Sequence, residues 1–291
     1  MAYLKPATMA EALDLMERYG SEGVVLLAGG TDLIPAMRRG AVAGNYLLDL
    51  AGLGLDTIEE SEGEIRLGAL ATFNSLLRSK PVQVRLPVLA QAASQIGAVQ
   101  TRSLATIGGN LCSAVPSLDS APALMVLGAR LRLVSKQEER VIAIENFFLG
   151  PRSTVRRADE ILTEIIVPLP GTTFGAGFLK HGRRKALTLA VVNAACALRP
   201  NESGEIGEVR IALGAVAPVP FRVCRAETLL VGERPSSELF AKAAFVAGEE
   251  TSPLSDLRAS AGYRRALSEV LVRRALHYAW REATGERGWG G

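Results

Sequence analysis

Short apolar runs, separated by turn residues, recur along most of the chain and predict β-strands. Val24–Leu27 is wholly apolar, as expected of a buried strand. Arg130–Val134 alternates polar and apolar residues, which is typical of a strand with one face in the core. Similar patterns predict strands at Tyr46–Leu50, Ile65–Leu70, Ile161–Val167, Phe174–His181, Leu189–Leu198 and Val209–Val216.

Other segments carry the spacing and end signals of helices. Thr8 and Glu11 form a capping box, so a helix should begin there, run to Tyr19 and stop at Gly20. Near the C-terminus, Leu267, Val270, Leu271 and Leu276 recur at helical spacing. The predicted helices beyond the first are Thr72–Leu77, Pro87–Ile96, Ala121–Leu127, Ala226–Leu230, Ser237–Ala247 and Ala261–Arg281.

The proline- and glycine-rich stretch Pro168–Gly171 is the best candidate for a domain boundary. It divides the 291 residues into segments 1–170 and 171–291, as expected of about two domains in a chain of this length. Residues 285–291 should form a loose tail. Helices and strands are both abundant, so the sequence predicts an α+β protein.

Composition and charge exclude several classes of function. A net charge of +3, with most arginine pairs expected on the solvated surface, argues against nucleic-acid binding. No apolar run is long enough to span a membrane, and the N-terminus lacks the pattern of a signal peptide. The three cysteines are widely spaced and form no CxxC, so we expect a cytoplasmic protein without disulfides and without a metal site.

Two glycine pairs are the main candidates for ligand chemistry. Gly29-Gly30 is followed by Thr31 and Asp32, and Gly108-Gly109 lies between Thr106 and Asn110. Glycine lets a backbone approach a ligand closely, and successive N–H groups in such turns can bind a phosphate. For either pair taken alone, a hairpin or tight turn without a ligand is the more common explanation, and neither pair fits a Rossmann or P-loop motif. The spacing alone therefore indicates only a possible phosphate-binding protein.

Several motifs together carry a more specific resemblance. In chain order they read AGGTDL at 28–33, TIGGN at 106–110, PSLD at 116–119, FFLGP at 147–151, DEIL at 159–162 and SAGYRRALSEVLVRRAL at 260–276. This ordered set resembles the flavin subunit of the xanthine dehydrogenase and carbon monoxide dehydrogenase family. The resemblance extends over nearly the whole chain.

The resemblance implies a fold, a cofactor and an assembly. The fold is a two-part FAD-binding domain of the vanillyl-alcohol oxidase type, with subdomains of about 1–55 and 56–170, followed by a small C-terminal α/β domain. The implied cofactor is FAD. The implied partners are a molybdopterin-binding large subunit and a small subunit with two [2Fe–2S] clusters, in a dimer of heterotrimers. The chain would pass electrons from these clusters through FAD to NAD, a quinone or oxygen.

The same resemblance implies roles for individual residues. The first diphosphate loop would comprise Ala28, Gly29, Gly30, Thr31, Asp32 and Leu33, and the second Thr106, Gly108, Gly109 and Asn110. Asp119 would contact the cofactor, Leu162 would lie against a ring of FAD, and Lys180 would lie near the flavin. From the residues alone, Asp119 could instead cap the helix that follows, and Lys180 could be a surface lysine. Cys112 is expected to be a small core residue.

Besides a non-enzymatic nucleotide-binding module, the sequence leaves two functional hypotheses. The first is an oxidoreductase subunit that transfers electrons and has no catalytic residue for the hydroxylation itself. The alternative is a self-sufficient flavin oxidase or dehydrogenase of the related fold, for which no clear catalytic base appears. Purines, N-heterocycles, aldehydes and carbon monoxide all remain possible substrates of the hydroxylase. No acidic residue occurs at 185–188, where the family often has one, which leaves the electron acceptor open.

Overall fold

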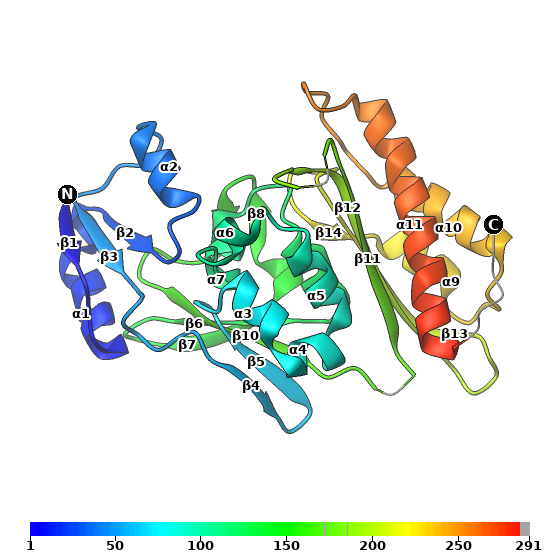
Figure 1. Cartoon of the computed structure of the whole chain (residues 1–291), viewed down its shortest axis with the longest axis horizontal. Helices are drawn as coiled ribbons and strands as arrows, with labels where there is room; N and C mark the ends of the chain where they lie inside the picture. Colours follow the sequence, from blue (N-terminus) through cyan, green and yellow to red (C-terminus); the bar gives the residue numbers. More distant parts are fainter. Residues whose placement is uncertain (172, 185, 286–291) are drawn as a thin grey trace.

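The three larger β-sheets follow one another along the long axis of the molecule (Figure 1). The computed structural model describes residues 1–171, 173–184 and 186–285. The tail predicted beyond Gly285 and the side chain of Lys185 lie outside the described residues. No helix in these ranges is both long and apolar enough to cross a membrane.

The first sheet is small, parallel and three-stranded, in the order β1-β3-β2. The Thr8 hydroxyl accepts a hydrogen bond from the Glu11 amide at 3.2 Å, so the predicted cap is confirmed. Leu13 and Met16 of the helix that follows are buried in a small core against this sheet. The elements are β1 Ala2–Leu4, α1 Met9–Tyr19, η1 Gly20–Glu22, β2 Val24–Leu27, α2 Leu33–Arg38 and β3 Tyr46–Asp49.

The central sheet has five antiparallel strands in the order β4-β5-β10-β6-β7. Its middle strand, β10, is almost entirely buried, in agreement with the apolar run in the sequence. A short hairpin, β8–β9, lies outside this sheet. The strands are β4 Ile58–Ser61, β5 Glu64–Gly68, β6 Arg130–Val134, β7 Glu139–Ala143, β8 Phe148–Gly150, β9 Ser153–Thr154 and β10 Ile161–Pro168.

A group of short helices covers the central sheet and shares one hydrophobic core with it. Fully buried Phe73, Leu89 and Leu124 come from three of these helices. The helices are α3 Phe73–Arg78, α4 Lys80–Arg85, α5 Pro87–Ser94, α6 Val99–Arg102, α7 Ile107–Ser113 and α8 Ser120–Val126, with the 3₁₀ turn η2 at Ile144–Asn146.

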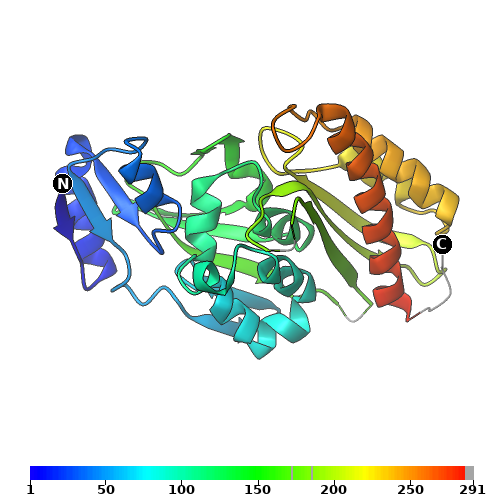
Figure 2. The ribbon, with the colours of Figure 1, turned by 45° about the horizontal axis from the view of Figure 1, so that its top comes forward.

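The C-terminal sheet has four antiparallel strands and is buried on both faces. Along β12, Ala195 and Ala197 belong to the core shared with the central helices, whereas Cys196 and Leu198 belong to the core under the C-terminal helices. Figure 2 shows α10 and α11 side by side on this sheet. The elements are β11 Gly175–Gly182, β12 Ala190–Pro200, β13 Ile206–Gly214, β14 Phe221–Arg222, α9 Cys224–Leu230, α10 Ser237–Glu249 and α11 Ala261–Thr284.

Two sequence predictions need correction. Val24–Leu27 is a strand, but it is only half-buried, because β2 is the edge of its sheet and faces a cavity. The second glycine pair was predicted to lie in a turn, but Gly108 and Gly109 lie in the first turn of the helix α7, and only Gly30 of the four paired glycines has a positive φ, +70°. The shortest elements, such as α2 and the β8–β9 hairpin, were not predicted because their periodicity is too short to detect.

We expect Gly108→Ala to destabilise the protein. A Cβ at Gly108 would lie 2.5 Å from the Ala69 Cβ and 2.7 Å from the Ala69 carbonyl oxygen, so α7 would have to move away from the backbone beside it. Overpacking of this kind lowers the free energy of unfolding by about 1–3 kcal/mol. Denaturant unfolding of the ligand-free protein measures the change.

The matched control for this prediction is Gly262→Ala in α11. A Cβ at Gly262 meets no atom within 4 Å, so this variant should keep its stability or gain up to about 1 kcal/mol from the higher helix propensity of alanine. Equal stability of the Gly108→Ala protein and the wild type would show that the close contact with Ala69 is unimportant.

Candidate functional site

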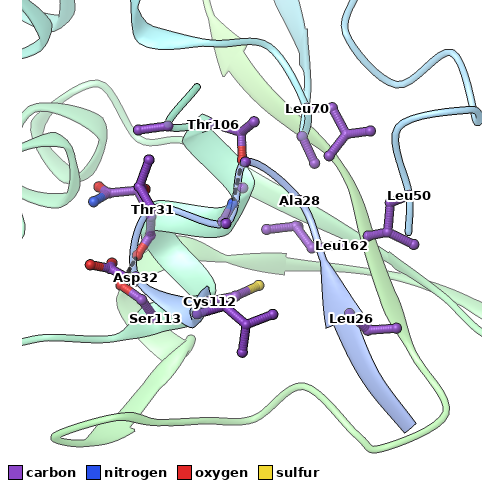
Figure 3. Close-up of a pocket in the computed structure, with 18 of the residues that line it drawn as sticks. Leu26, Ala28, Thr31, Asp32, Leu50, Leu70, Thr106, Cys112, Ser113 and Leu162 are labelled. Carbon is purple, nitrogen blue, oxygen red and sulfur yellow. Dashed lines mark hydrogen bonds between the residues drawn. The ribbon is translucent and has the colours of Figure 1, made fainter. Parts of the chain in front are cut away.

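A cavity of about 430 Å³ lies between the N-terminal sheet and the central helices. The two glycine segments, residues 28–33 and 106–110, both line it and lie close to each other (Figure 3). The first segment connects β2 to α2, and the second comprises the N-cap and the first turn of α7. The structure therefore brings together two motifs that are almost eighty residues apart in the sequence, roughly the difference between Gly30 and Gly108.

The first segment presents unpaired backbone donors. Within the described residues, the amides of Gly29, Gly30, Thr31 and Asp32 donate to no protein acceptor. Gly30 has a φ of +70°, and a Cβ on Gly29 would lie 1.8 Å from the Leu104 carbonyl oxygen. Glycine is thus required at both positions, once for conformation and once for space. Free amides at adjacent positions in a turn form a site for an anion.

The second segment differs from the sequence prediction of a second set of free amides. The Gly108 amide donates to the Ala69 carbonyl at 2.8 Å, and the Gly109 amide donates to the Thr106 hydroxyl oxygen at 3.1 Å. The Asn110 amide donates to the Thr106 carbonyl at 2.9 Å. This segment can still offer two side-chain donors, the hydroxyl of Thr106 and the side-chain amide of Asn110. Because Gly108 and Gly109 have no side chains, they do not take up space in the cavity.

One end of the cavity is apolar. Leu26, Leu50, Leu70 and Leu162 approach it from different segments of the chain, and Figure 3 shows them grouped on the side away from Thr31. These side chains offer a surface that suits the flat face of an aromatic ring. Unpaired donors next to an apolar end are what a nucleotide requires.

Asp119 and Lys180 lie outside this cavity but contact each other. The Lys180 ammonium group is 2.5 Å from a carboxylate oxygen of Asp119, and the two side chains are 3% and 8% exposed. Lys180 also donates to the Gln95 carbonyl at 2.9 Å, and Asn193 donates to the other Asp119 oxygen at 2.8 Å. Lys180 is not a surface lysine, because its side chain is buried. Asp119 is not a side-chain helix cap, because its carboxylate makes no cap hydrogen bond.

Burial and charge act in opposite directions on Asp119. Burial raises the pKa of its carboxyl group, and the Lys180 ammonium and the Asn193 amide offset part of that increase. Lys180 also borders a second cavity of about 330 Å³, together with Gln95 and His181. The predicted residues therefore fall into two groups, eleven around the first cavity and the Asp119–Lys180 pair beside the second.

Four polar residues that line the first cavity were not predicted as site residues: Cys112, Ser113, Arg152 and Arg156. Cys112 packs against the core as predicted, but it also faces the cavity, and burial raises the pKa of its thiol to about 11. The motif FFLGP ends one residue before Arg152 and was the only signal near it. No local pattern marks Arg156, which was included with the surface arginine pairs.

The groups that line the first cavity match the chemical groups of FAD. Free backbone amides at Gly29–Asp32 suit a diphosphate, the leucines at one end suit a ring, and Gly108 and Gly109 add no side chain to the lining. Across the residues that the structure describes, no group of three or more His, Cys, Asp or Glu side chains is close enough to hold a metal ion.

Comparison with known proteins identifies both parts of the chain. Residues 1–170 match the family model described as the FAD binding domain in molybdopterin dehydrogenase. Residues 177–279 match the CO dehydrogenase flavoprotein C-terminal domain.

Individual relatives agree over almost the full length. The chain is 33% identical to the carbon monoxide dehydrogenase medium chain of Hydrogenophaga pseudoflava, over 96% of each chain. It is 29% identical to the xanthine dehydrogenase FAD-binding subunit of Escherichia coli O157:H7, over 98% of each. A solved carbon monoxide dehydrogenase from Hydrogenophaga pseudoflava, which lacks the Mo-pyranopterin moiety of the molybdenum cofactor, superposes with a TM-score of 0.93 at 32% identity, covering 97% of this chain and 98% of the other.

These matches confirm the fold predicted from the motifs, an FAD-binding domain followed by a flavoprotein C-terminal domain, and they confirm FAD as the cofactor of that domain. The chain belongs to the family of FAD-binding medium subunits of molybdopterin dehydrogenases.

Proposed function

We propose that this chain is the electron-transfer subunit of a molybdenum hydroxylase complex. FAD, when bound, supplies a carrier that accepts and releases electrons. The chain's own residues hold it, exclude water from it and set the charge around it. The observation that carries the proposal is the run of free amides at Gly29–Asp32, which lines the same cavity as Thr106 and Asn110, and this cavity has an apolar end.

The proposed binding of FAD follows the two groups of residues. The diphosphate would accept hydrogen bonds from the amides of the first glycine segment and from the Thr106 and Asn110 side chains of the second. Leu162 contacts a ring at the apolar end of the cavity. Lys180, with Asp119 beneath it, lies at the flavin edge beside the second cavity. We also propose that the FAD-binding domain comprises residues 1–170, with subdomains of about 1–55 and 56–170.

The partners and the acceptor also belong to the proposal. We infer a molybdopterin-binding large subunit and a small subunit with two [2Fe–2S] clusters, in a dimer of heterotrimers. Electrons would pass from these clusters through this chain to NAD, a quinone or oxygen. Relatives named for carbon monoxide and for xanthine are similarly close, so identity does not choose the substrate. The free cysteines are compatible with the cytoplasmic location that we propose.

One observation favours the alternative, a self-sufficient flavin oxidase. His181 borders the second cavity and could act as a base or attach a flavin covalently. Its ring contacts Tyr263 edge-on, at a centroid distance of 6.2 Å, which gives it a packing role as well. Release of FAD on denaturation would count against covalent attachment.

We expect Gly109→Val to abolish FAD binding. The new Cβ would lie 2.8 Å from the Thr106 hydroxyl oxygen and 3.5 Å from the Ala28 Cβ, and the methyl groups would fill the space between the two glycine segments. Flavin absorbance of the purified protein measures FAD content. Gly20→Val is the control, because a Cβ at Gly20 meets no atom within 4 Å. A folded Gly109→Val protein with full FAD content would rule out this diphosphate site.

We expect the charges of Lys180 and Asp119 to shift the flavin potential in opposite directions. Lys180→Met removes a cation and leaves the buried Asp119 carboxylate unpaired, so the potential should fall by about 30–65 mV, the equivalent of one charge-assisted hydrogen bond. Asp119→Asn should raise it. Spectroelectrochemical titration of the FAD-loaded proteins gives both values.

The control for the potential is Lys136→Met. Lys136 forms surface ion pairs with Asp14 and Glu17, so its removal should leave the potential unchanged. If Lys180→Met keeps both FAD and the wild-type potential, Lys180 does not lie at the flavin edge.

We expect the FAD-loaded chain alone to show no flavin reduction by xanthine, an aldehyde or carbon monoxide. Hydroxylation with oxygen from water requires an electrophile such as a metal, which the proposal assigns to the large subunit. Addition of both partner subunits should restore substrate-dependent bleaching of the flavin absorbance, and dithionite serves as the positive control. Bleaching by the chain alone would replace the electron-transfer proposal with the oxidase alternative.

A further inference from the structure

The charges that line the first cavity come from three residues only, within the part of the chain that the structure describes. Asp32 contributes a carboxylate, and Arg152 and Arg156 contribute guanidinium groups. An FAD diphosphate carries about two negative charges, and the amides of the glycine segment are neutral. Without the arginines, the diphosphate would meet one negative charge and no positive one.

Arg156 is held in place without being neutralised. Its guanidinium group donates to the backbone carbonyls of Arg157 at 2.9 Å and of Glu160 at 2.7 Å. The Glu160 carboxylate accepts two hydrogen bonds from the Arg140 guanidinium group, at 2.6 and 2.9 Å. No carboxylate of the described chain forms an ion pair with Arg156. The Arg156 charge acts on Cys112, which lines the cavity: it lowers the pKa of the Cys112 thiol, against the larger effect of burial, which raises that pKa.

Arg152 occupies a position where glycine would be expected. It lies at the tip of the β8–β9 hairpin, directly after Pro151, and has a φ of +60°. A turn with proline followed by a positive φ normally places Gly or Asn at the second position. The Arg152 amide donates to the Ala114 carbonyl at 2.8 Å, and Ala114 itself has a φ of +44°. Strained backbone next to a ligand cavity suggests a functional reason for the side chain.

We propose that Arg152 and Arg156 are additional cofactor-binding residues, which attract and hold the diphosphate of FAD through their charge. This inference rests on the proposed position of the diphosphate between the two glycine segments. Arg156 supplies a cation that is already fixed in place. Arg152 supplies a more exposed cation from the hairpin tip, which can close over the phosphates. Together, the two positive charges offset the negative charges of the Asp32 carboxylate and of the diphosphate.

The first test measures the dissociation constant of FAD from the full chain, freed of flavin, by flavin fluorescence at low and high salt. Arg156→Gln and Arg152→Gly should each weaken binding about tenfold at low salt, and less at high salt, because screening weakens the wild-type interaction. Arg156→Lys keeps the charge and should retain most of the affinity. Arg157→Gln is the matched control, since Arg157 is the next residue, loses the same charge and does not line the cavity.

The second test separates binding from a structural role of Arg152. Because glycine adopts a positive φ without strain, Arg152→Gly should leave the melting temperature of the FAD-free protein unchanged or raise it, while FAD affinity falls. A fall in both would show that Arg152 serves the hairpin instead. If Arg156→Gln does not fold, the salt dependence of the wild type and of Arg152→Gly decides the question.

The outcomes distinguish this inference from the proposed site itself. Wild-type affinity in both arginine variants, or a loss that does not depend on salt, would overturn the inference. If Gly109→Val still loses FAD in that case, the diphosphate site stands and only the role of the arginines fails. If Gly109→Val binds FAD normally, the site itself is wrong.

Discussion

Close contact between backbones is the constraint on which the candidate site depends. Gly29 lies against the Leu104 carbonyl and Gly108 lies against Ala69, and at both places a methyl group would overlap the neighbouring atoms. The Gly29–Leu104 contact holds the turn after β2 against the segment before α7, and the Gly108–Ala69 contact packs α7 against the end of β5, so both glycine segments line one cavity. The same contacts leave the turn after β2 with amides that face the cavity instead of a protein acceptor.

The unpaired amides of the turn after β2 link the fold to the cofactor in the proposed site. Gly29, Gly30 and Thr31 are only half-buried and Asp32 is exposed, so water reaches this turn when no ligand is bound. A ligand that binds only the folded state shifts the folding equilibrium by its binding free energy. In the proposed site, this effect would act at the contact between the first two sheets, where the N-terminal core contains few buried residues.

The C-terminal sheet reaches the site through one buried polar network. Lys180 on β11 and Asn193 on β12 are cross-strand partners, and both side chains bind Asp119 at the start of α8. A buried ion pair alone stabilises a protein little, because both charges lose hydration. Here the side-chain amide of Asn193 and the carbonyl of Gln95 add one further hydrogen bond to each member of the pair. The network therefore holds one cation beside the second cavity in a defined position.

The sequence by itself determined the long elements and the family. β10, β12 and α11 have apolar patterns long enough to identify, and the ordered motifs AGGTDL and TIGGN indicated both FAD and its two binding segments. Only the tertiary structure decided how these parts act. It placed Gly108 and Gly109 in a helix, paired Lys180 with Asp119, and turned Arg152 and Arg156 toward the cavity. Local patterns record the preferences of neighbouring residues, whereas burial, ion pairing and the charge around a cavity depend on residues that meet only after folding.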